Sequence, residues 1–275
     1  KRTQSGSPDD IHEGITVRNL TLDQVRNDAM DPVHSPYLEG GPWLAEFTVA
    51  VIHWEAVYRA VISDVKILNA VADAYSDQAR VSSTPNETNN IIRSCHIINT
   101  GRYGVHVGSA ERGATLIGNH IDSARAFGLY FCSQAQYSVV VGNTFYNCRS
   151  GIGGSDTRDS NQESVTSSTP YDDIVGDIGS LISGNVFLGG PVNNPKSSEN
   201  TSVYAIDVGP KSVVSGNVIM HYNGGVRLVD GAVDCIVQGN YIHLPDFSTG
   251  LGIQILNNAH GANISGNTIV GSKLI

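Results

Sequence analysis

Apolar and polar residues alternate in short segments that recur along the chain. Six segments share the pattern apolar, any residue, Gly, Asn, any residue, apolar. They are LIGNHI (116–121), VVGNTF (140–145), ISGNVF (182–187), VSGNVI (214–219), VQGNYI (237–242) and ISGNTI (264–269). Short alternating runs rich in β-branched residues, broken by Gly and Asn, predict strands joined by tight turns.

A second motif lies between these copies, in which a small residue precedes an alternating run. Its copies are YGVHVGS (from 103), FGLYFCS (127), SGIGGS (150), YAIDVG (204), GGVRLV (224) and LGIQIL (251). Weaker copies of the first motif occur at 17–22, 63–68 and 91–97. The basic period of about 23 to 24 residues, with two or three strands in each, predicts a parallel β-helix. A propeller blade needs a longer repeat, and a leucine-rich repeat needs a Leu spacing that is not found.

The repeat also predicts the core of an all-β solenoid with about eight coils. The apolar positions should form two inward columns. The columns are Leu116, Val140, Ile182, Val214, Val237 and Ile264, and Ile121, Phe145, Phe187, Ile219, Ile242 and Ile269. The Asn residues at 119, 143, 185, 217, 240 and 267 should stack as a ladder of amides, with Cys95 in their place one coil earlier.

These motifs resemble those of the right-handed parallel β-helix superfamily, which includes pectate lyases, polygalacturonases, alginate epimerases and phage tailspikes. The resemblance covers residues 15–270. It implies one right-handed domain over residues 1–275, whose ends look cut from a longer chain. One fold hosts many activities, and none of the sharper catalytic signatures of these enzymes is complete in this sequence.

The charge and the lengths of the apolar runs argue against two classes of partner, nucleic acid and membrane. The formal charge of −9 argues against nucleic acid, because affinity for phosphate depends on cationic side chains. No run approaches the ~20 apolar residues of a membrane span, so membrane insertion is not expected. Cys95, Cys132, Cys148 and Cys235 lack the spacing of a metal site, and we expect reduced, mostly buried thiols.

An outward column on the second motif is the first candidate for a site. It contains Ser76, His106, Tyr130, Gly153, Asp207, Arg227 and Gln254. A His beside a Tyr, and an Asp beside an Arg, suit the hydroxyls of a sugar chain. The competing interpretation is a row of solvated side chains, in which Asp207 and Arg227 form an ordinary cross-strand ion pair.

Asp77 is a local anomaly, because the alignment of the second motif places it where Val107 and Phe131 point inward. One alternative is a buried Asp77 with a raised pKa, as in a catalytic acid. The other is a shifted register in which Asp73, Tyr75 and Asp77 face outward together. We assign Asp73, Asp77 and His106 as candidate catalytic residues, since a glycosidase needs two carboxylates near the scissile bond.

Basic and aromatic residues extend the predicted binding surface. Residues 79–149 contain six Arg, no Lys and three acids. Arg102 is expected to hold an acidic group of the substrate, or alternatively to pair with Glu111 or Asp122. Trp54 and Tyr130 are expected to stack on sugar rings; the alternative for Trp54 is a place in the core. Tyr37 and Trp43 are further candidates for stacking on sugars.

Three long insertions, 24–46, 155–179 and 190–201, are expected to wall a groove along one side of the rod. Asp172, Asp173 and Asp177 in the second insertion form the one candidate calcium site. Their spacing matches no named calcium loop, so the sequence predicts neither a metal nor another cofactor.

We interpret the chain as a polysaccharide-degrading β-helix, hydrolase-like, of a secreted or virion-surface type. One alternative is a lyase or epimerase of the same fold. Another is a non-catalytic adhesive shaft that binds polysaccharide or oligosaccharide without turnover. The resemblance to tailspikes and the outward apolar residues also suggest a homotrimer.

Overall fold

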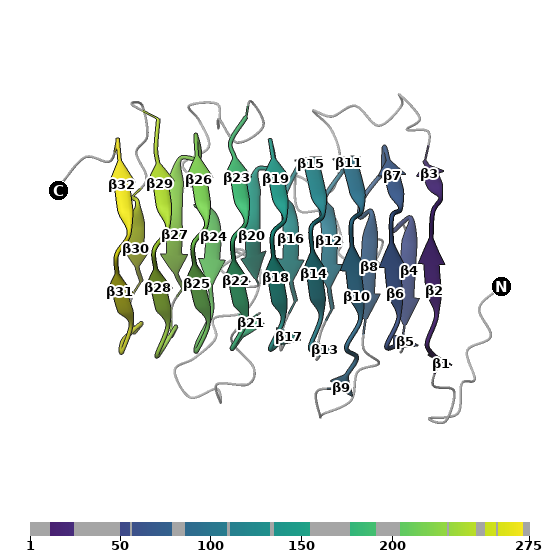
Figure 1. The fold of residues 1–275 in the computed structure, drawn as a ribbon, viewed down its shortest axis with the longest axis horizontal. Coiled ribbons are helices and arrows are strands. Elements are labelled where there is room, and N and C mark those ends of the chain that lie inside the picture. Colours follow the sequence, from purple (N-terminus) through teal and green to yellow (C-terminus); the bar gives the residue numbers. More distant parts are fainter. Residues whose placement is uncertain are drawn as a thin grey trace, which may run out of the picture.

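The computed structural model describes most of the solenoid and omits several connections. The described residues are 12–24, 50–55, 57–78, 86–108, 111–132, 135–154, 177–190, 204–229, 231–245, 251–256 and 258–271. Within them the chain forms strands and turns only, and successive coils stack along a rod (Figure 1). Most of the three insertions lies outside the described residues, as do Tyr37, Trp43, Asp172 and Asp173.

Three parallel sheets run along the rod, two with nine strands and one with eight. Sheet 1 consists of β2 (Thr16–Arg18), β6 (Val61–Ser63), β10 (Ile91–Arg93), β14 (Thr115–Ile117), β18 (Val139–Val141), β22 (Leu181–Ser183), β25 (Val213–Ser215), β28 (Ile236–Gln238) and β31 (Asn263–Ser265). Sheet 2 consists of β3 (Thr21–Asp23), β7 (Lys66–Leu68), β11 (His96–Thr100), β15 (His120–Ala124), β19 (Thr144–Tyr146), β23 (Val186–Leu188), β26 (Val218–Met220), β29 (Tyr241–His243) and β32 (Thr268–Val270). Sheet 3 consists of β4 (Ile52–Glu55), β8 (Tyr75–Gln78), β12 (Tyr103–Val107), β16 (Phe127–Phe131), β20 (Ser150–Gly154), β24 (Tyr204–Val208), β27 (Gly224–Leu228) and β30 (Ile253–Ile255).

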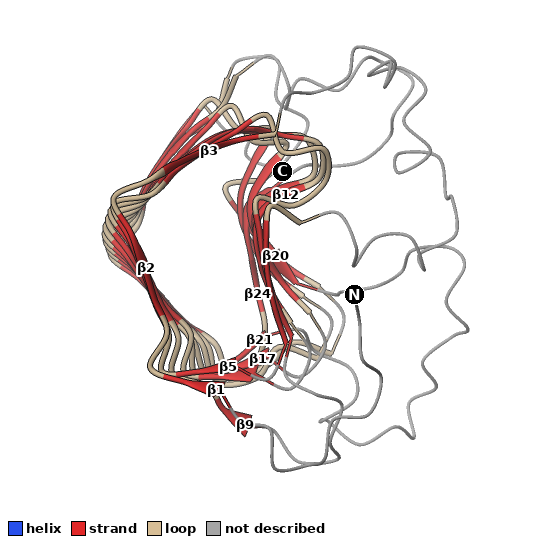
Figure 2. Ribbon diagram, turned by 90° about the vertical axis from the view of Figure 1, so that its right-hand side faces the viewer, coloured by secondary structure: helices blue, strands red, loops and turns tan. Residues whose placement is uncertain are grey.

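Short strands close the corner between sheets 3 and 1. β1 (His12–Glu13) pairs with β5 (Val57–Tyr58). A four-stranded sheet contains β9 (Asn86–Glu87), β13 (Glu111–Arg112), β17 (Ala135–Gln136) and β21 (Asp177–Ile178). Viewed along the rod, the coils superpose around one interior (Figure 2).

The register confirms the predicted inward columns. Leu116 pairs with Val140 and Ile121 pairs with Phe145, each one repeat apart. Every member is fully buried except Ile264 and Ile269, which are 39% and 40% exposed because they lie on the last described coil. The described residues form nine coils, against about eight expected.

Small residues at the start of the sheet 3 strands make room for this core. A Cβ atom on Gly128 would lie 2.5 Å from the Phe145 ring, and one on Gly104 would lie 2.6 Å from Ile121. Gly151 and Phe187 are related in the same way. The small residue of the second motif is therefore required because sheet 2 side chains fill the space in front of it.

The Asn ladder is present at the corner between sheets 1 and 2. The amide nitrogen of Asn119 donates to Oδ1 of Asn143 (2.9 Å) and to the carbonyl of Ile92 (2.9 Å). The backbone N–H of Asn119 donates to the same Oδ1 atom (2.9 Å). The pattern repeats through Asn185, Asn217, Asn240 and Asn267.

The ladder begins as the sequence predicts. At the first position the N–H of Cys95 donates to Oδ1 of Asn119 (3.0 Å). The Gly before each Asn has a positive φ, such as 62° at Gly118, which lets the chain turn sharply ahead of the buried amide. None of the four cysteines is bridged, and Cys95, Cys148 and Cys235 are buried. The expectation of reduced, mostly buried thiols is confirmed.

The chain's longer connections all meet sheet 3. Residues 25–49 and 191–203 lead from a sheet 2 strand into a sheet 3 strand, and 79–85 and 155–176 leave a sheet 3 strand toward sheet 1. The corner between sheets 1 and 2 is instead a two-residue turn in every coil. Sheet 3 is therefore the face that the insertions flank.

In the part of the chain that the structure covers, no helix is long and apolar enough to cross a membrane. Some apolar side chains face outward, such as Ile117, which is 45% exposed, and Val270, which is 41% exposed. The homotrimer suggested by such residues stays a prediction.

The ladder predicts a defined loss of stability for Asn143→Ala. This change removes the acceptor of two N–H groups of Asn119 and leaves them buried without a partner. We expect the free energy of unfolding to fall by about 1 to 3 kcal/mol in urea denaturation. The control Gln238→Ala truncates an exposed side chain of sheet 1 and should have little effect. Equal stability of the two variants would contradict the ladder's role.

Candidate functional site

The outward side of sheet 3 carries the candidate residues in register. Ser76, His106 and Tyr130 are Cα partners on β8, β12 and β16, and Tyr130 pairs with Gly153 on β20. Farther along, Asp207 pairs with Arg227, and Arg227 pairs with Gln254. The predicted outward column is confirmed, and the same register adds His53 beside Ser76.

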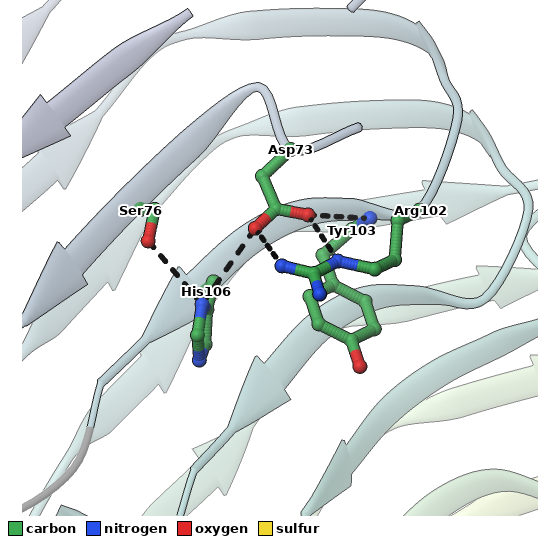
Figure 3. Close-up of polar contacts among 5 residues, drawn as sticks. All are labelled: Asp73, Ser76, Arg102, Tyr103 and His106. Atoms are coloured by element: carbon green, nitrogen blue, oxygen red, sulfur yellow. Dashed lines mark hydrogen bonds and ion pairs between the residues drawn. The ribbon is translucent and has the colours of Figure 1, made fainter. Parts of the chain in front are cut away.

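Asp73, Arg102 and His106 form a buried charged cluster on this side (Figure 3). Nε of Arg102 donates to Oδ1 of Asp73 (2.8 Å), and Nη2 of Arg102 donates to Oδ2. Nδ1 of His106 lies 3.6 Å from Oδ2 of Asp73 and 3.3 Å from Oγ of Ser76. The exposed fractions are 1% for Asp73, 6% for Arg102 and 2% for His106, so the three charges are screened little by solvent.

The cluster fixes opposite charges on its members. Burial alone would raise the pKa of Asp73, but hydrogen bonds from Arg102 and His106 outweigh burial and hold that pKa below its usual value. Burial would lower the pKa of His106, but side-chain hydrogen bonds with Asp73 and Cys132 raise it to about 9. At neutral pH His106 is therefore an imidazolium, which can donate a proton but cannot accept one.

Aromatic rings surround the imidazole. The rings of Tyr103 and Tyr130 stack with centroids 4.4 Å apart, and each centroid lies 5.5 Å from that of His106. Arg102 places its guanidinium carbon 4.4 Å from the centroid of Tyr103. A Cβ atom on Gly153 would overlap the ring of Phe127, which explains why the column contains a Gly at that coil. Tyr130 is only half-buried, so it is the part of this cluster that a ligand can reach.

Asp77 lies on the opposite side of sheet 3 from Asp73. It pairs with Val107 and is 2% exposed, as the first alternative from the sequence requires. Its Oδ2 atom accepts hydrogen bonds from Tyr75 Oη (2.8 Å) and Asn90 Nδ2. The alternative in which Asp73, Tyr75 and Asp77 all face outward is wrong, because the inward register continues through β8.

Asp77 also lies close enough to the fully buried Glu111 for the two carboxyl groups to change each other's pKa. Burial raises the pKa of Asp77, and burial together with the charge of Asp77 raises the pKa of Glu111 well above its usual value. Two carboxyl groups in contact inside a protein cannot both be ionised at modest cost, so they share a proton. The pair is a proton-bearing group of the interior.

Arg102 and Trp54 differ from their expected roles. The partner of Arg102 is Asp73, rather than Glu111 or Asp122, because Glu111 faces inward to Asp77 while Asp122 binds Ser123 (2.6 Å) on sheet 2. Trp54 pairs in register with Asp77, and its ring meets Tyr75 edge-on at 5.6 Å. It therefore packs against the core, away from the outward rings of Tyr103 and Tyr130.

Asp207 and Arg227 form a bidentate ion pair, with Nε and Nη2 of Arg227 each 2.8 Å from a carboxylate oxygen. Arg227 also lies over the ring of Tyr204 at 5.3 Å. The competing sequence interpretation, a cross-strand pair, describes this contact correctly. A role of the pair in binding stays a prediction.

The distance between the carboxylates of the outward face limits the reactions that it can catalyse. Among its described side chains, the acidic residues are Asp73, which precedes β8, and Asp207 on β24. They are four strand steps apart, or roughly 19 Å at ~4.8 Å per step. Catalytic carboxylates of glycosidases lie ~5 to 9.5 Å apart. The side chains placed by the structure also contain no group of three His, Cys, Asp or Glu able to hold a metal ion.

Sequence reasoning missed several members of the cluster. Tyr103 was not singled out, although it is aligned with Phe127 as the first residue of the second motif. Glu111 lies on β13, at a corner that neither motif includes, so no predicted column contained its contact with Asp77. The break in strict alternation could have identified Tyr103: the consecutive residues Gly104 and Val105 both face the interior, which returns positions 103 and 106 to the same side.

The buried ion pair predicts a large effect of Asp73→Asn. The change leaves the cations of Arg102 and His106 buried without their counter-ion. We expect a loss of about 3 to 5 kcal/mol in urea denaturation. Asp207→Asn is the matched control, and it should cost less because the Arg227 side chain is 25% exposed and can be solvated. Equal losses would show that burial does not govern these pairs.

His106 also predicts a pH dependence of stability. Because its pKa is raised from 6.5 to about 9, its charged interactions stabilise the fold fully below pH ~6.5 and are lost as the pH rises through about 9. The stability difference between the protein and His106→Gln should therefore shrink between pH 7 and 10. Urea denaturation at fixed pH values measures it, and a constant difference over this range would refute the assignment of charge.

Comparisons with known proteins agree with this architecture. The family described as "Right handed beta helix region" matches residues 45–187, which is more than half of the chain. A search among curated proteins found no match. Two solved structures are similar. The alginate lyase from Paenibacillus sp. str. FPU-7 has a TM-score of 0.49 and 13% identity, over 79% of this chain and 86% of that chain.

The second structure is the Dettilon tailspike protein, with a TM-score of 0.41 and 12% identity. That similarity covers 79% of this chain and 49% of the tailspike chain. The family match extends from before β4 to β23, and it includes Asp73, Arg102, His106 and Tyr130. With its three parallel sheets, its inward columns and this match, the chain belongs to the right-handed β-helix family.

Proposed function

We propose that the protein binds an acidic polysaccharide along the outward face of sheet 3 and cleaves it by β-elimination at Tyr130 and His106. The observation that supports this most is a buried imidazolium beside a half-buried phenol. A cation next to a group that can exchange protons is what elimination from a uronic acid requires.

The face suits an extended sugar chain. Its strands are parallel, and the chain connects to the insertions at both ends of these strands. Phe127 and Tyr130, both half-buried, offer ring surface for stacking against sugars. Arg125 and Arg149 are half-buried at the turns that lead into β16 and β20, so the same coils carry cations suited to carboxylates.

Elimination is favoured over hydrolysis by the distribution of carboxyl groups. Hydrolysis needs two carboxyl groups around one glycosidic bond. Asp73 is engaged by Arg102, Asp77 faces the interior and Asp207 lies about four strand steps away. Elimination needs instead a base for the proton beside the uronate carboxylate, a cation for that carboxylate and an acid for the leaving oxygen.

The cluster supplies candidates for these roles. Tyr130 contacts the substrate: its phenolate removes the proton beside the carboxylate and returns it to the glycosidic oxygen as the C–O bond breaks and the C=C bond forms. His106, held protonated by Asp73, supplies the positive charge that stabilises the anion formed when the proton leaves. Asp73 and Arg102 act as positioning residues, since their bidentate contact fixes the carboxylate against the imidazole. Turnover should accordingly fall as the pH rises through about 9.

A non-catalytic glycan-binding shaft is the second candidate. The observation that favours it is the burial of His106 at 2% exposure, in a cluster where Asp73 is the shared partner of Arg102 and His106. In that case Phe127, Tyr130 and Arg227 would bind sugar without turnover, and His106 would only stabilise the face.

A polysaccharide panel separates these functions. Purified protein is incubated with uronate-rich and neutral polysaccharides, and both new reducing ends and the ultraviolet absorbance of unsaturated uronates are followed. Elimination gives both signals on acidic substrates. Reducing ends without unsaturated products would establish hydrolysis and contradict the proposal. Binding without either signal would support the shaft.

Tyr130→Phe then tests the site. Loss of its hydroxyl should lower turnover by about 10²- to 10⁴-fold with the fold unchanged by circular dichroism. The control Tyr146→Phe removes a hydroxyl that is exposed on sheet 2, and it should retain full activity. Full activity of Tyr130→Phe on a substrate that the parent cleaves would place the chemistry elsewhere.

A further inference from the structure

Two pairs of histidines lie across adjacent coils at sheet 2. The ring centroids of the C-terminal pair, His221 and His243, are 5.8 Å apart, and those of the N-terminal pair, His96 and His120, are also 5.8 Å apart. Two imidazoles that bind one metal ion at ~2.1 Å per nitrogen have centroids roughly 5 to 6 Å apart. Within the described residues, none of these four rings forms a hydrogen bond. Their nitrogens are therefore available to a ligand.

Met220 adds a third donor to the C-terminal pair. It is the last residue of β26 and the Cα partner of His243, the last residue of β29, so the two side chains stand side by side on the outward face. His221 follows Met220 directly, and its N–H donates to the carbonyl of His243 (3.0 Å). Met220 and His243 are half-buried, and His221 is exposed. A thioether and two imidazoles therefore meet at a surface that an ion can reach.

The corner at His221 does not depend on its imidazole. The backbone there has a φ of 62°, in the left-handed region. Equivalent corners of earlier coils contain Asn69, Asn99 and Asn147, also at positive φ. Their amides bond along the rod, as when Nδ2 of Asn99 donates to Oδ1 of Asn69 (2.8 Å). The ring of His221 makes no such bond among the described residues, so it adds a metal-binding group where other coils have a structural amide.

The two pairs differ in their neighbours. Leu188 and Val270, the register partners of Met220 and His243 on the flanking coils, carry no charge. The N-terminal pair instead lies beside Lys66, the Cα partner of its first histidine, and an ammonium group opposes the binding of a cation. Thioether sulfur is a soft ligand that selects copper(I), and imidazole also suits copper. The donors of the C-terminal pair therefore favour copper over a hard cation.

We propose that Met220, His221 and His243 form a copper(I) site with two imidazole ligands and one thioether ligand. The described side chains contain no group of three His, Cys, Asp or Glu that could hold a metal ion, and here the third donor is the sulfur of Met220. The site lies at sheet 2, apart from the outward face of sheet 3. The inference therefore stands or falls separately from polysaccharide cleavage.

NMR of the methionine methyl groups tests the site in the whole protein. With carbon-13 in these methyl groups, the chain gives two signals, from Met30 and Met220, and Met220→Leu assigns them. Copper(I), kept reduced with ascorbate and added in small excess, should shift the signal of Met220 and the ring signals of His221 and His243. The signal of Met30 should not move. A Met220 signal that does not respond to copper(I) would overturn the proposal.

Competition with a coloured copper(I) chelator measures the affinity. The proteins compared all carry Cys132→Ser, because a partly exposed thiol would compete for copper(I). Met220→Leu and His243→Gln should each weaken binding by at least about tenfold, the loss typical even of residues that only support a metal ligand. The matched control His120→Gln removes an imidazole from the N-terminal pair and should leave the affinity unchanged. An unchanged affinity of Met220→Leu, or an equal loss in His120→Gln, would contradict the assigned site.

Discussion

The stacking of one amide per coil is the interaction on which the rest of the structure depends. From Asn143 to Asn240, each ladder Asn accepts two N–H bonds from the coil before it, donates to a backbone carbonyl of that coil and donates to the next Asn. A coil displaced by one residue would lose all of these bonds and would turn its apolar side chains outward. The ladder therefore locks the register of sheets 1 and 2, and the register of sheet 3 follows because the core joins all three.

A locked register lets residues far apart in the sequence act as one group. Asp73, His106 and Tyr130 come from three coils, and their contacts exist only because β8, β12 and β16 are held in step. Burying these charges is costly unless each has a partner. Asp73 contacts both Arg102 and His106, which offsets that cost and, against the effect of burial, raises the pKa of His106. On the inner side of β8, Asp77 meets Glu111 of β13, and the two carboxyl groups reduce the cost of their burial by sharing a proton.

The fold could be predicted from the sequence because equivalent positions of successive repeats lie next to each other on neighbouring coils. The contact of Asn119 with Asn143 was predicted from the repeat, and the alignment of Asp77 with Val107 gave its inward position as one of two alternatives. Side-chain contacts between residues at different positions of the repeat could not be predicted from the sequence. Arg102 reaches Asp73, and Glu111 reaches Asp77, through side-chain conformations and corners that the alternation of strands does not specify. Trp54 shows the same limit, since its side of the strand became clear only from the register with Asp77.

The central claim is that His106, buried under the outward face of sheet 3, is protonated at neutral pH and that this face binds an acidic glycan. Nitrogen-15 NMR of the histidine side chains, recorded against pH with and without an acidic oligosaccharide, tests it most directly. The account predicts that His106 titrates near 9 and that its signals shift when the oligosaccharide binds. A titration near the ordinary value of about 6.5, together with unchanged signals on addition of sugar, would contradict it.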